Sequence, residues 1–218
     1  MIYIFDLDDT LYDERQYVES GFKAVARFAK QQWGLNEQDS LKSMIGILDN
    51  EGRGAVFNRW LALFNLDSKT NIKRCLSVYR MHQPDINMPE AHSELLHRLP
   101  KPLYLVTDGN KIVQHNKVKA LGIEPLFKRV FITHRFGTRH AKPSIHCFEI
   151  IKQTEDCAWH DMVYIGDNPA KDFVNLNKLG MHTVRVLTGV HRDVPAKKGF
   201  DASVVINSLL QLKGAFSR

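Results

Sequence analysis

The chain opens with a short run of apolar, β-branched and aromatic residues, Ile2 to Phe5, which stops abruptly at an acidic cluster. Continuous apolar runs of this length are typical of strands buried on both faces of a parallel sheet. Asp6 and Asp8 follow at alternate positions, so in an extended chain they project to the same side. Open α/β sheets bind ligands beyond the carboxyl ends of such strands. Two carboxylates this close repel each other, which indicates a bound cation or proton transfer; an acidic turn is the alternative interpretation.

Further apolar runs follow, separated by segments with helical periodicity. This alternation predicts an α/β fold, a doubly wound (Rossmann-like) parallel sheet with right-handed crossovers. Besides residues 2–5, the expected strands are 103–106, 130–132, 162–165, 183–187 and 203–206, and the expected helices of this core are 90–99, 111–121, 144–153 and 169–179.

The segment 15–83 has a different character, because apolar residues recur in it at helical spacing between polar, glycine-containing loops. Helices are expected near residues 22–33, 41–48, 55–64 and 72–81. We therefore expect a small all-helical cap domain at 15–83, inserted into an α/β core made of residues 1–14 and 84–218.

Composition excludes some classes of protein. No stretch is long and apolar enough for a membrane span, no signal peptide opens the sequence, and the net charge of +6 includes no basic block of the kind that binds nucleic acid. Cys75, Cys147 and Cys157 are odd in number and lack metal-type spacing, so we expect reduced thiols and a cytoplasmic protein. We expect a monomer or a homodimer.

Four expected strand ends or helix starts carry reactive side chains, and this topology places all four at one edge of the sheet. They are Asp6, Asp8 and Thr10; Thr107; Lys142; and Asp167 and Asp172. The chain resembles the haloacid dehalogenase (HAD) superfamily, and specifically phosphohydrolases with a helical cap inserted after the first motif. The resemblance covers nearly the whole core in order, through Phe5-Asp-Leu-Asp-Asp-Thr-Leu11, Val106-Thr-Asp-Gly109, Lys142-Pro143 and Gly166-Asp-Asn-Pro-Ala-Lys-Asp172.

The resemblance implies a role for each catalytic position. Asp6 becomes the nucleophile that forms an aspartyl-phosphate, and Asp8 the acid that protonates the leaving oxygen and then the base that activates water. Lys142 supplies fixed positive charge, and Thr107 donates a hydrogen bond to the phosphoryl group. In the transition state of phosphoryl transfer, negative charge spreads over the equatorial oxygens, and these groups would stabilise that charge.

The resemblance also implies Mg²⁺ as the cofactor, which suits a site made from few carboxylates. Asp6, Asp167 and the backbone carbonyl of Asp8 would bind the ion directly, and Asp172, about one helical turn beyond Asp167, would act through water.

For the substrate, Asp8 favours phosphate esters, since halide release needs no protonation. Thr107, Asp108, Lys142 and Arg53 are the candidate substrate-binding residues, although Asp108 stands where the family commonly has Asn, and its charge suits a phosphate pocket only if it points away. The substrate is expected to be a small phosphorylated metabolite, a sugar phosphate or a nucleoside monophosphate. A phosphomutase and a catalytically silent binding or regulatory protein of the same fold are the alternatives.

Overall fold

The computed structural model describes residues 1–212, which form two compact units. The first takes Met1–Glu14 together with the chain from Asn87 onward, and the second is Arg15–Ile86. Among the residues described, no helix has both the length and the apolar character needed to cross a membrane.

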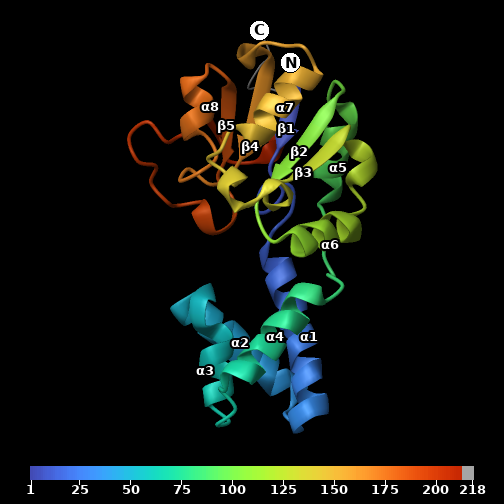
Figure 1. Cartoon of the computed structure of the whole chain (residues 1–218), viewed down its shortest axis with the longest axis vertical. Coiled ribbons are helices and arrows are strands. Elements are labelled where there is room, and N and C mark those ends of the chain that lie inside the picture. The colour runs from blue at the N-terminus through green and yellow to red at the C-terminus, as the bar shows by residue number, and fades with distance from the viewer. Residues whose placement is uncertain (213–218) are drawn as a thin grey trace. The chain divides into compact units, whose positions relative to one another are not determined.

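A six-stranded sheet forms the centre of the first unit, with every neighbouring pair parallel (Figure 1). In the order β3-β2-β1-β4-β5-β6, β1 lies between β2 and β4, and the edge strands are β3 and β6. The predicted doubly wound sheet is confirmed. Its strands are β1 (Ile2–Phe5), β2 (Leu103–Thr107), β3 (Arg129–Ile132), β4 (Met162–Gly166), β5 (His182–Val186) and β6 (Val204–Ile206).

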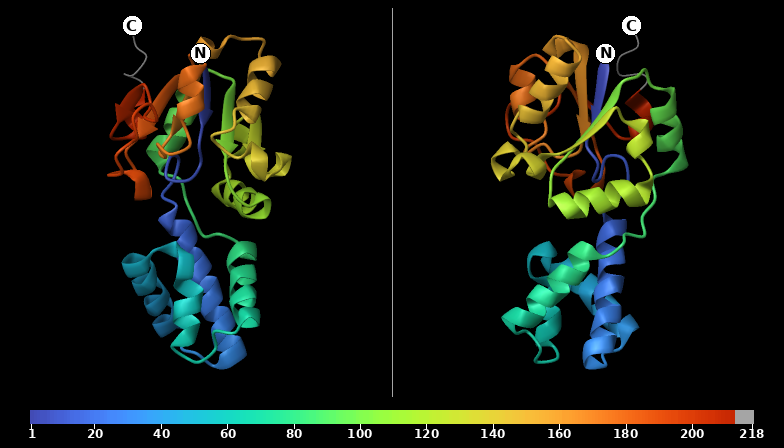
Figure 2. Two further views of the ribbon diagram at one scale, coloured as in Figure 1. Left: turned by 60° about the vertical axis from the view of Figure 1, so that its left-hand side comes forward. Right: turned by 45° about the vertical axis from the view of Figure 1, so that its right-hand side comes forward.

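Helices cover both faces of this sheet (Figure 2). On one face, α7 (His146–Thr154) and α8 (Val174–Lys178) pack in one apolar cluster with side chains of β1, β2 and β4, among them Ile4, Tyr104 and Tyr164. On the other lie α5 (Glu90–Arg98) and α6 (Lys111–Leu121). The central strands are therefore buried on both sides, which explains their continuous apolar sequences.

One predicted helix is much shorter than expected. The sequence suggested a start at Pro169, but α8 begins at Val174, and the preceding residues form turns. The side chain of Asn168 accepts a hydrogen bond from the backbone amide of Ala170 at 2.9 Å, and the backbone amide of Asn168 donates to Asp172 Oδ2 at 2.9 Å. The backbone closes one turn here, with the amide of Asp172 donating to the carbonyl of Asn168 at 3.0 Å, and the bonds to the side chains of Asn168 and Asp172 compete with a continued helix.

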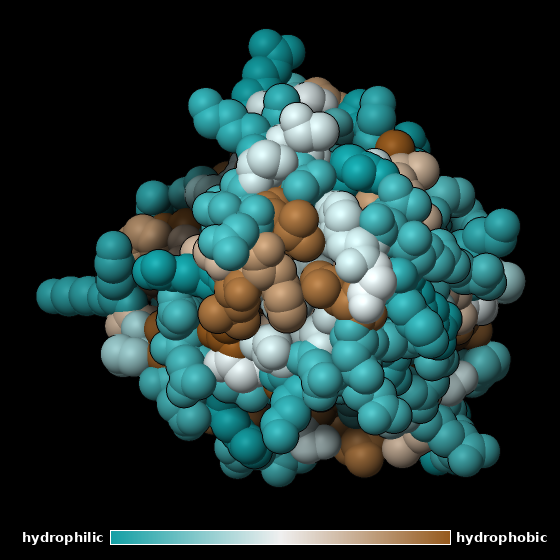
Figure 3. Space-filling view, turned by 90° about the horizontal axis from the view of Figure 1, so that it is seen from below, coloured by the Kyte–Doolittle hydropathy of each residue, from teal (hydrophilic) through white to brown (hydrophobic). Residues whose placement is uncertain are grey.

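The second unit contains the four helices α1 (Arg15–Trp33), α2 (Glu37–Glu51), α3 (Val56–Ala62) and α4 (Lys69–Met81). They have an apolar core of their own, with Trp60 and Cys75 fully buried. The unit ends at Ile86, slightly beyond the expected boundary at residue 83, and Ser20 Oγ of α1 accepts a hydrogen bond from the amide of Asp85 at 2.8 Å. Figure 3 shows a small group of apolar side chains within a mainly hydrophilic face of the molecule.

All three cysteines are free thiols: Cys75 and Cys147 are buried, and Cys157 is half-buried.

Candidate active site

The carboxyl ends of three neighbouring strands carry the reactive residues. Asp6 directly follows β1, Thr107 is the last residue of β2, and Asp167 directly follows β4. Because β2, β1 and β4 are adjacent and parallel, these side chains share one edge of the sheet. The amide of Asp6 donates to the carbonyl oxygen of Ile165 at 2.8 Å, which continues the β1–β4 pairing into the site.

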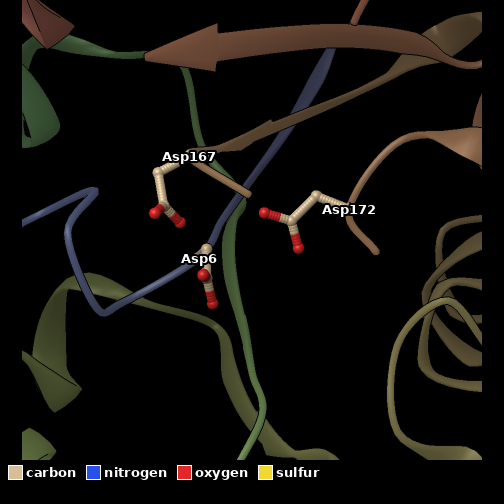
Figure 4. A group of neighbouring side chains, drawn as sticks. All are labelled: Asp6, Asp167 and Asp172. Carbon is tan, nitrogen blue, oxygen red and sulfur yellow. The ribbon is translucent and has the colours of Figure 1, made fainter. Parts of the chain in front are cut away.

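Three carboxylates converge there. Asp6, Asp167 and Asp172 each offer an oxygen, and these oxygens all lie within 4.8 Å of one another (Figure 4). All three residues are buried. Asp172 reaches this place from a turn, and a Cβ atom on Gly166 would lie 2.5 Å from its Oδ2. The last position of β4 must therefore lack a side chain for the cluster to form.

Lys142 supplies the positive charge beside this cluster. Its Nζ lies 3.0 Å from Asp6 Oδ1 and 2.8 Å from Asp172 Oδ1, and it donates to the hydroxyl oxygen of Tyr164 at 2.7 Å. Burial acts to lower the pKa of Lys142, but the charges of Asp172 and Asp6 raise it well above the usual value. The amine is therefore a permanent cation.

One lysine does not balance three buried carboxylates. Burial raises the pKa of Asp167 to about 9, and the charges of Asp6 and Asp172 add to the rise. Burial likewise raises the pKa of Asp6 to about 7, although Lys142 opposes the change. Clustered carboxylate oxygens with excess negative charge are the donors that Mg²⁺ prefers, so these three residues fit that ion.

The carboxylate of Asp8 lies outside this cluster and has its own partners. Oδ1 accepts from Tyr12 Oη at 2.8 Å and from Lys117 Nζ at 2.7 Å, while Oδ2 accepts from Gln114 Nε2 at 2.8 Å. Burial acts to raise the pKa of Asp8, but the charge of Lys117 and these hydrogen bonds outweigh it, and the net pKa is lowered. Both oxygens of the Asp8 carboxylate are therefore engaged within the protein.

Thr107 is buried, and its Oγ1 accepts a hydrogen bond from Gln114 Nε2 at 2.6 Å. Because the oxygen serves as the acceptor, the hydroxyl proton can be donated elsewhere.

Asp108 faces the loop that carries Lys142. Its Oδ1 accepts from Thr133 Oγ1 at 2.6 Å and from the backbone amide of Lys142 at 3.1 Å, and its Oδ2 lies 3.3 Å from Lys171 Nζ. Burial acts to raise the pKa of Asp108, but the charges of Lys142 and Lys171 outweigh it and lower the pKa. Its carboxylate is thus occupied within the protein, and a contact with substrate stays a prediction.

Arg53 opens a 3₁₀ turn, η1 (Arg53–Ala55), in the helical unit. Its predicted contact with substrate also stays a prediction.

Sequence reasoning assigned no role to Lys117, Gln114, Tyr164 or Lys171. Gln114 and Lys117 are three residues apart on α6, and both are buried although polar. A polar pair at helical spacing inside an otherwise buried face is the signal that could have identified them. Tyr164 lies within the apolar run of β4 and gave no such signal.

Comparison with known proteins gives a family match. A family model described as haloacid dehalogenase-like hydrolase matches residues 1–180. The glyceraldehyde 3-phosphate phosphatase of Methanocaldococcus jannaschii is 29% identical over 218 residues, covering 96% of this chain and 93% of the relative. A protein of the same name from Pyrococcus furiosus is 25% identical and covers 100% and 93% of the two chains.

Among solved structures, the magnesium-bound putative HAD-hydrolase YfnB from Bacillus subtilis aligns with a TM-score of 0.68 at 16% identity. The alignment covers 100% of this chain and 98% of that one. At this identity the likeness shows the fold.

Proposed function

Because the chain belongs to the haloacid dehalogenase-like hydrolases, we propose that it is a Mg²⁺-dependent phosphatase that hydrolyses a small phosphorylated metabolite through an aspartyl-phosphate on Asp6. The observation that carries the proposal is the contact of Lys142 Nζ with Asp6 Oδ1 at 3.0 Å, beside the Asp6–Asp167–Asp172 cluster. This arrangement combines an acidic nucleophile, a fixed cation and a set of metal ligands.

In the first step, Asp6 attacks the phosphorus atom, and the bond between phosphorus and the leaving oxygen breaks. Lys142 stabilises the charge on the transferred group, because its ammonium is already beside Asp6 and needs no reorganisation. The hydroxyl of Thr107 donates a hydrogen bond to a phosphoryl oxygen, while Gln114 Nε2 donates to the hydroxyl oxygen and fixes its position.

Asp8 handles the proton in both steps. Its protonated form gives the proton to the leaving alkoxide, and the resulting carboxylate takes one from the water that attacks the aspartyl-phosphate. Phosphate and free Asp6 are then released, and Asp8 carries the proton needed for the next cycle. Atoms and charge balance as ester plus water giving alcohol plus phosphate.

Asp6 and Asp167, together with the backbone carbonyl of Asp8, would hold the Mg²⁺ ion directly. Asp172, whose carboxylate belongs to the same cluster, would act through water. When bound, the ion neutralises excess negative charge at the cluster and acts as a Lewis acid on a phosphoryl oxygen.

For the substrate we propose a sugar phosphate, and glyceraldehyde 3-phosphate is the first compound to test because the two relatives compared above bear that name. Nucleoside monophosphates form the comparison set. The helical unit, as the proposed cap, would supply specificity, with Arg53 as a candidate contact.

The test is phosphate release by the purified full chain with Mg²⁺ or with excess chelator. We expect turnover only with Mg²⁺, and a loss of at least about 10³-fold in Asp6→Asn. Exposed Asp67 gives the matched control Asp67→Asn, which should keep wild-type activity. Metal-independent hydrolysis, or full activity in Asp6→Asn, would contradict the proposal.

The same assay separates the alternatives. A phosphomutase would convert a sugar phosphate to its isomer without releasing phosphate. A silent binding protein would bind Mg²⁺ and turn over no member of the panel.

A further inference from the structure

Lys117 is almost fully buried, with 2% of its side chain exposed, although a lysine normally extends into solvent. Its Nζ lies 2.7 Å from Asp8 Oδ1 and 2.9 Å from Glu14 Oε1. Both acids lie in the loop between β1 and α1, and Lys117 lies in α6. A buried cation persists only with such compensation, so both ion pairs are needed to keep the lysine in this place.

Three hydrogen bonds fix the orientation of the Asp8 carboxylate. Lys117 and Tyr12 donate to one oxygen and Gln114 to the other, so rotation of the group breaks at least one bond to a buried donor. Among these donors, Lys117 alone is charged, and charge-assisted hydrogen bonds are about twice as strong as neutral ones. Lys117 is therefore the strongest restraint on the orientation of Asp8.

The geometry points to Lys117, anchored by Glu14, as a positioning residue that holds the Asp8 carboxylate in the orientation needed for proton transfer. This inference rests on the proposed function, in which Asp8 exchanges protons with the leaving group and with the attacking water. Lys117 acts on the reaction only through its contact with Asp8. Its loss slows the proton-transfer steps and leaves attack by Asp6 in place.

A chromogenic substrate separates these steps. The p-nitrophenolate ion is a weak base and leaves without a proton, so formation of the aspartyl-phosphate from p-nitrophenyl phosphate needs little help from Asp8. Hydrolysis of that intermediate still needs Asp8 to activate water. A displaced Asp8 therefore leaves the first turnover fast and slows all later ones.

The variant to test is Lys117→Met, which keeps the length of the side chain and removes its charge. With p-nitrophenyl phosphate and Mg²⁺, rapid mixing should show a burst of about one p-nitrophenolate per chain, then a steady state at least about tenfold slower than wild type. With an alkyl phosphate, kcat should fall at least as much while KM stays within about twofold. Lys119→Met, an exposed position on the same helix, is the matched control and should behave as wild type.

A role in folding alone gives a different result, because misfolded chains lower the burst amplitude and the steady-state rate in parallel. That parallel loss, or an unchanged steady-state rate in Lys117→Met, overturns the inference.

Should Lys117→Met fail to fold, Glu14→Gln is the second variant. A burst followed by a slowed steady state is expected for it, and wild-type kinetics overturn the inference. A wild-type protein that releases no phosphate from any substrate overturns the proposed function and this inference together, whereas wild-type turnover with unaltered Lys117→Met kinetics overturns this inference alone.

Discussion

The carboxylate of Asp108 accepts a hydrogen bond from the backbone amide of Lys142 at 3.1 Å. Asp108 follows β2, and Lys142 lies in the loop before α7, so this contact ties together two loops that are distant in the sequence. The carboxylate of Asp108 thereby holds the loop that carries Lys142, and its charge is compensated by Lys171.

We predict that Asp108→Ala lowers kcat about fivefold, because the Lys142 backbone loses an acceptor worth about 1 kcal/mol and the lysine becomes less well placed. Asp108→Asn keeps an acceptor oxygen and should stay within about threefold of wild type. Steady-state kinetics of the two variants check this. Equal losses would show that the charge of Asp108 matters more than its hydrogen bond to Lys142.

Gly166→Ala should abolish most activity, because the added Cβ would lie 2.5 Å from Asp172 Oδ2 and displace that carboxylate. A shift of this kind at a catalytic centre costs about 100-fold or more in kcat. Calorimetry should also show weaker Mg²⁺ binding. Gly46 has open space around its Cβ position within α2, so Gly46→Ala is the control and should leave activity unchanged.

Tyr164→Phe removes the hydroxyl that accepts from Lys142 Nζ at 2.7 Å and donates to the carbonyl of Val106 at 3.3 Å. We expect kcat to fall about three- to tenfold with KM little changed, since a hydrogen bond contributes about 0.5–1.5 kcal/mol. Tyr104→Phe is the control, because its hydroxyl bonds to Glu155 and has no contact with Lys142. The kinetic constants of both variants check the prediction, and equal kcat values would contradict it.

The stabilisation of the fold by Mg²⁺ should grow with pH. Burial raises the pKa of Asp167 to about 9, and an aspartate in an unfolded chain has a pKa near 3.9, so the metal-free fold loses stability as the pH rises through this window. Mg²⁺ binds the deprotonated carboxylates, and protons compete with it at lower pH. At one fixed Mg²⁺ concentration, the increase in Tm should therefore be larger at pH 8.5 than at pH 6.

Thermal denaturation with Mg²⁺ or with chelator checks this, with Asp167→Asn as the variant in which the increase should largely disappear. An increase in Tm that is independent of pH, or that shrinks as the pH rises, would contradict the prediction that Asp6, Asp167 and Asp172 bind Mg²⁺.

The sequence alone predicted the strands and most of the core helices, because apolar runs and helical periodicity depend on neighbouring residues. It also placed Asp6, Thr107 and Asp167 at the ends of particular strands, and the order of strands in a parallel sheet then put them at one edge. The helix expected from Pro169 begins only at Val174, because hydrogen bonds to the side chains of Asn168 and Asp172 compete with the helical ladder. Helical periodicity in the sequence does not reveal this local effect.

The sequence by itself determined where each central strand ends and which residue types follow it. This is because steric preferences and apolar runs depend on residues that are consecutive in the chain. Only the tertiary structure decided the partners of those residues: Lys117 and Gln114 for Asp8, the Lys142 loop for Asp108, and a turn for Asp172. Such pairings depend on how helices pack on the sheet and on the free energy of leaving a buried charge uncompensated, and both follow from contacts between residues far apart in the chain.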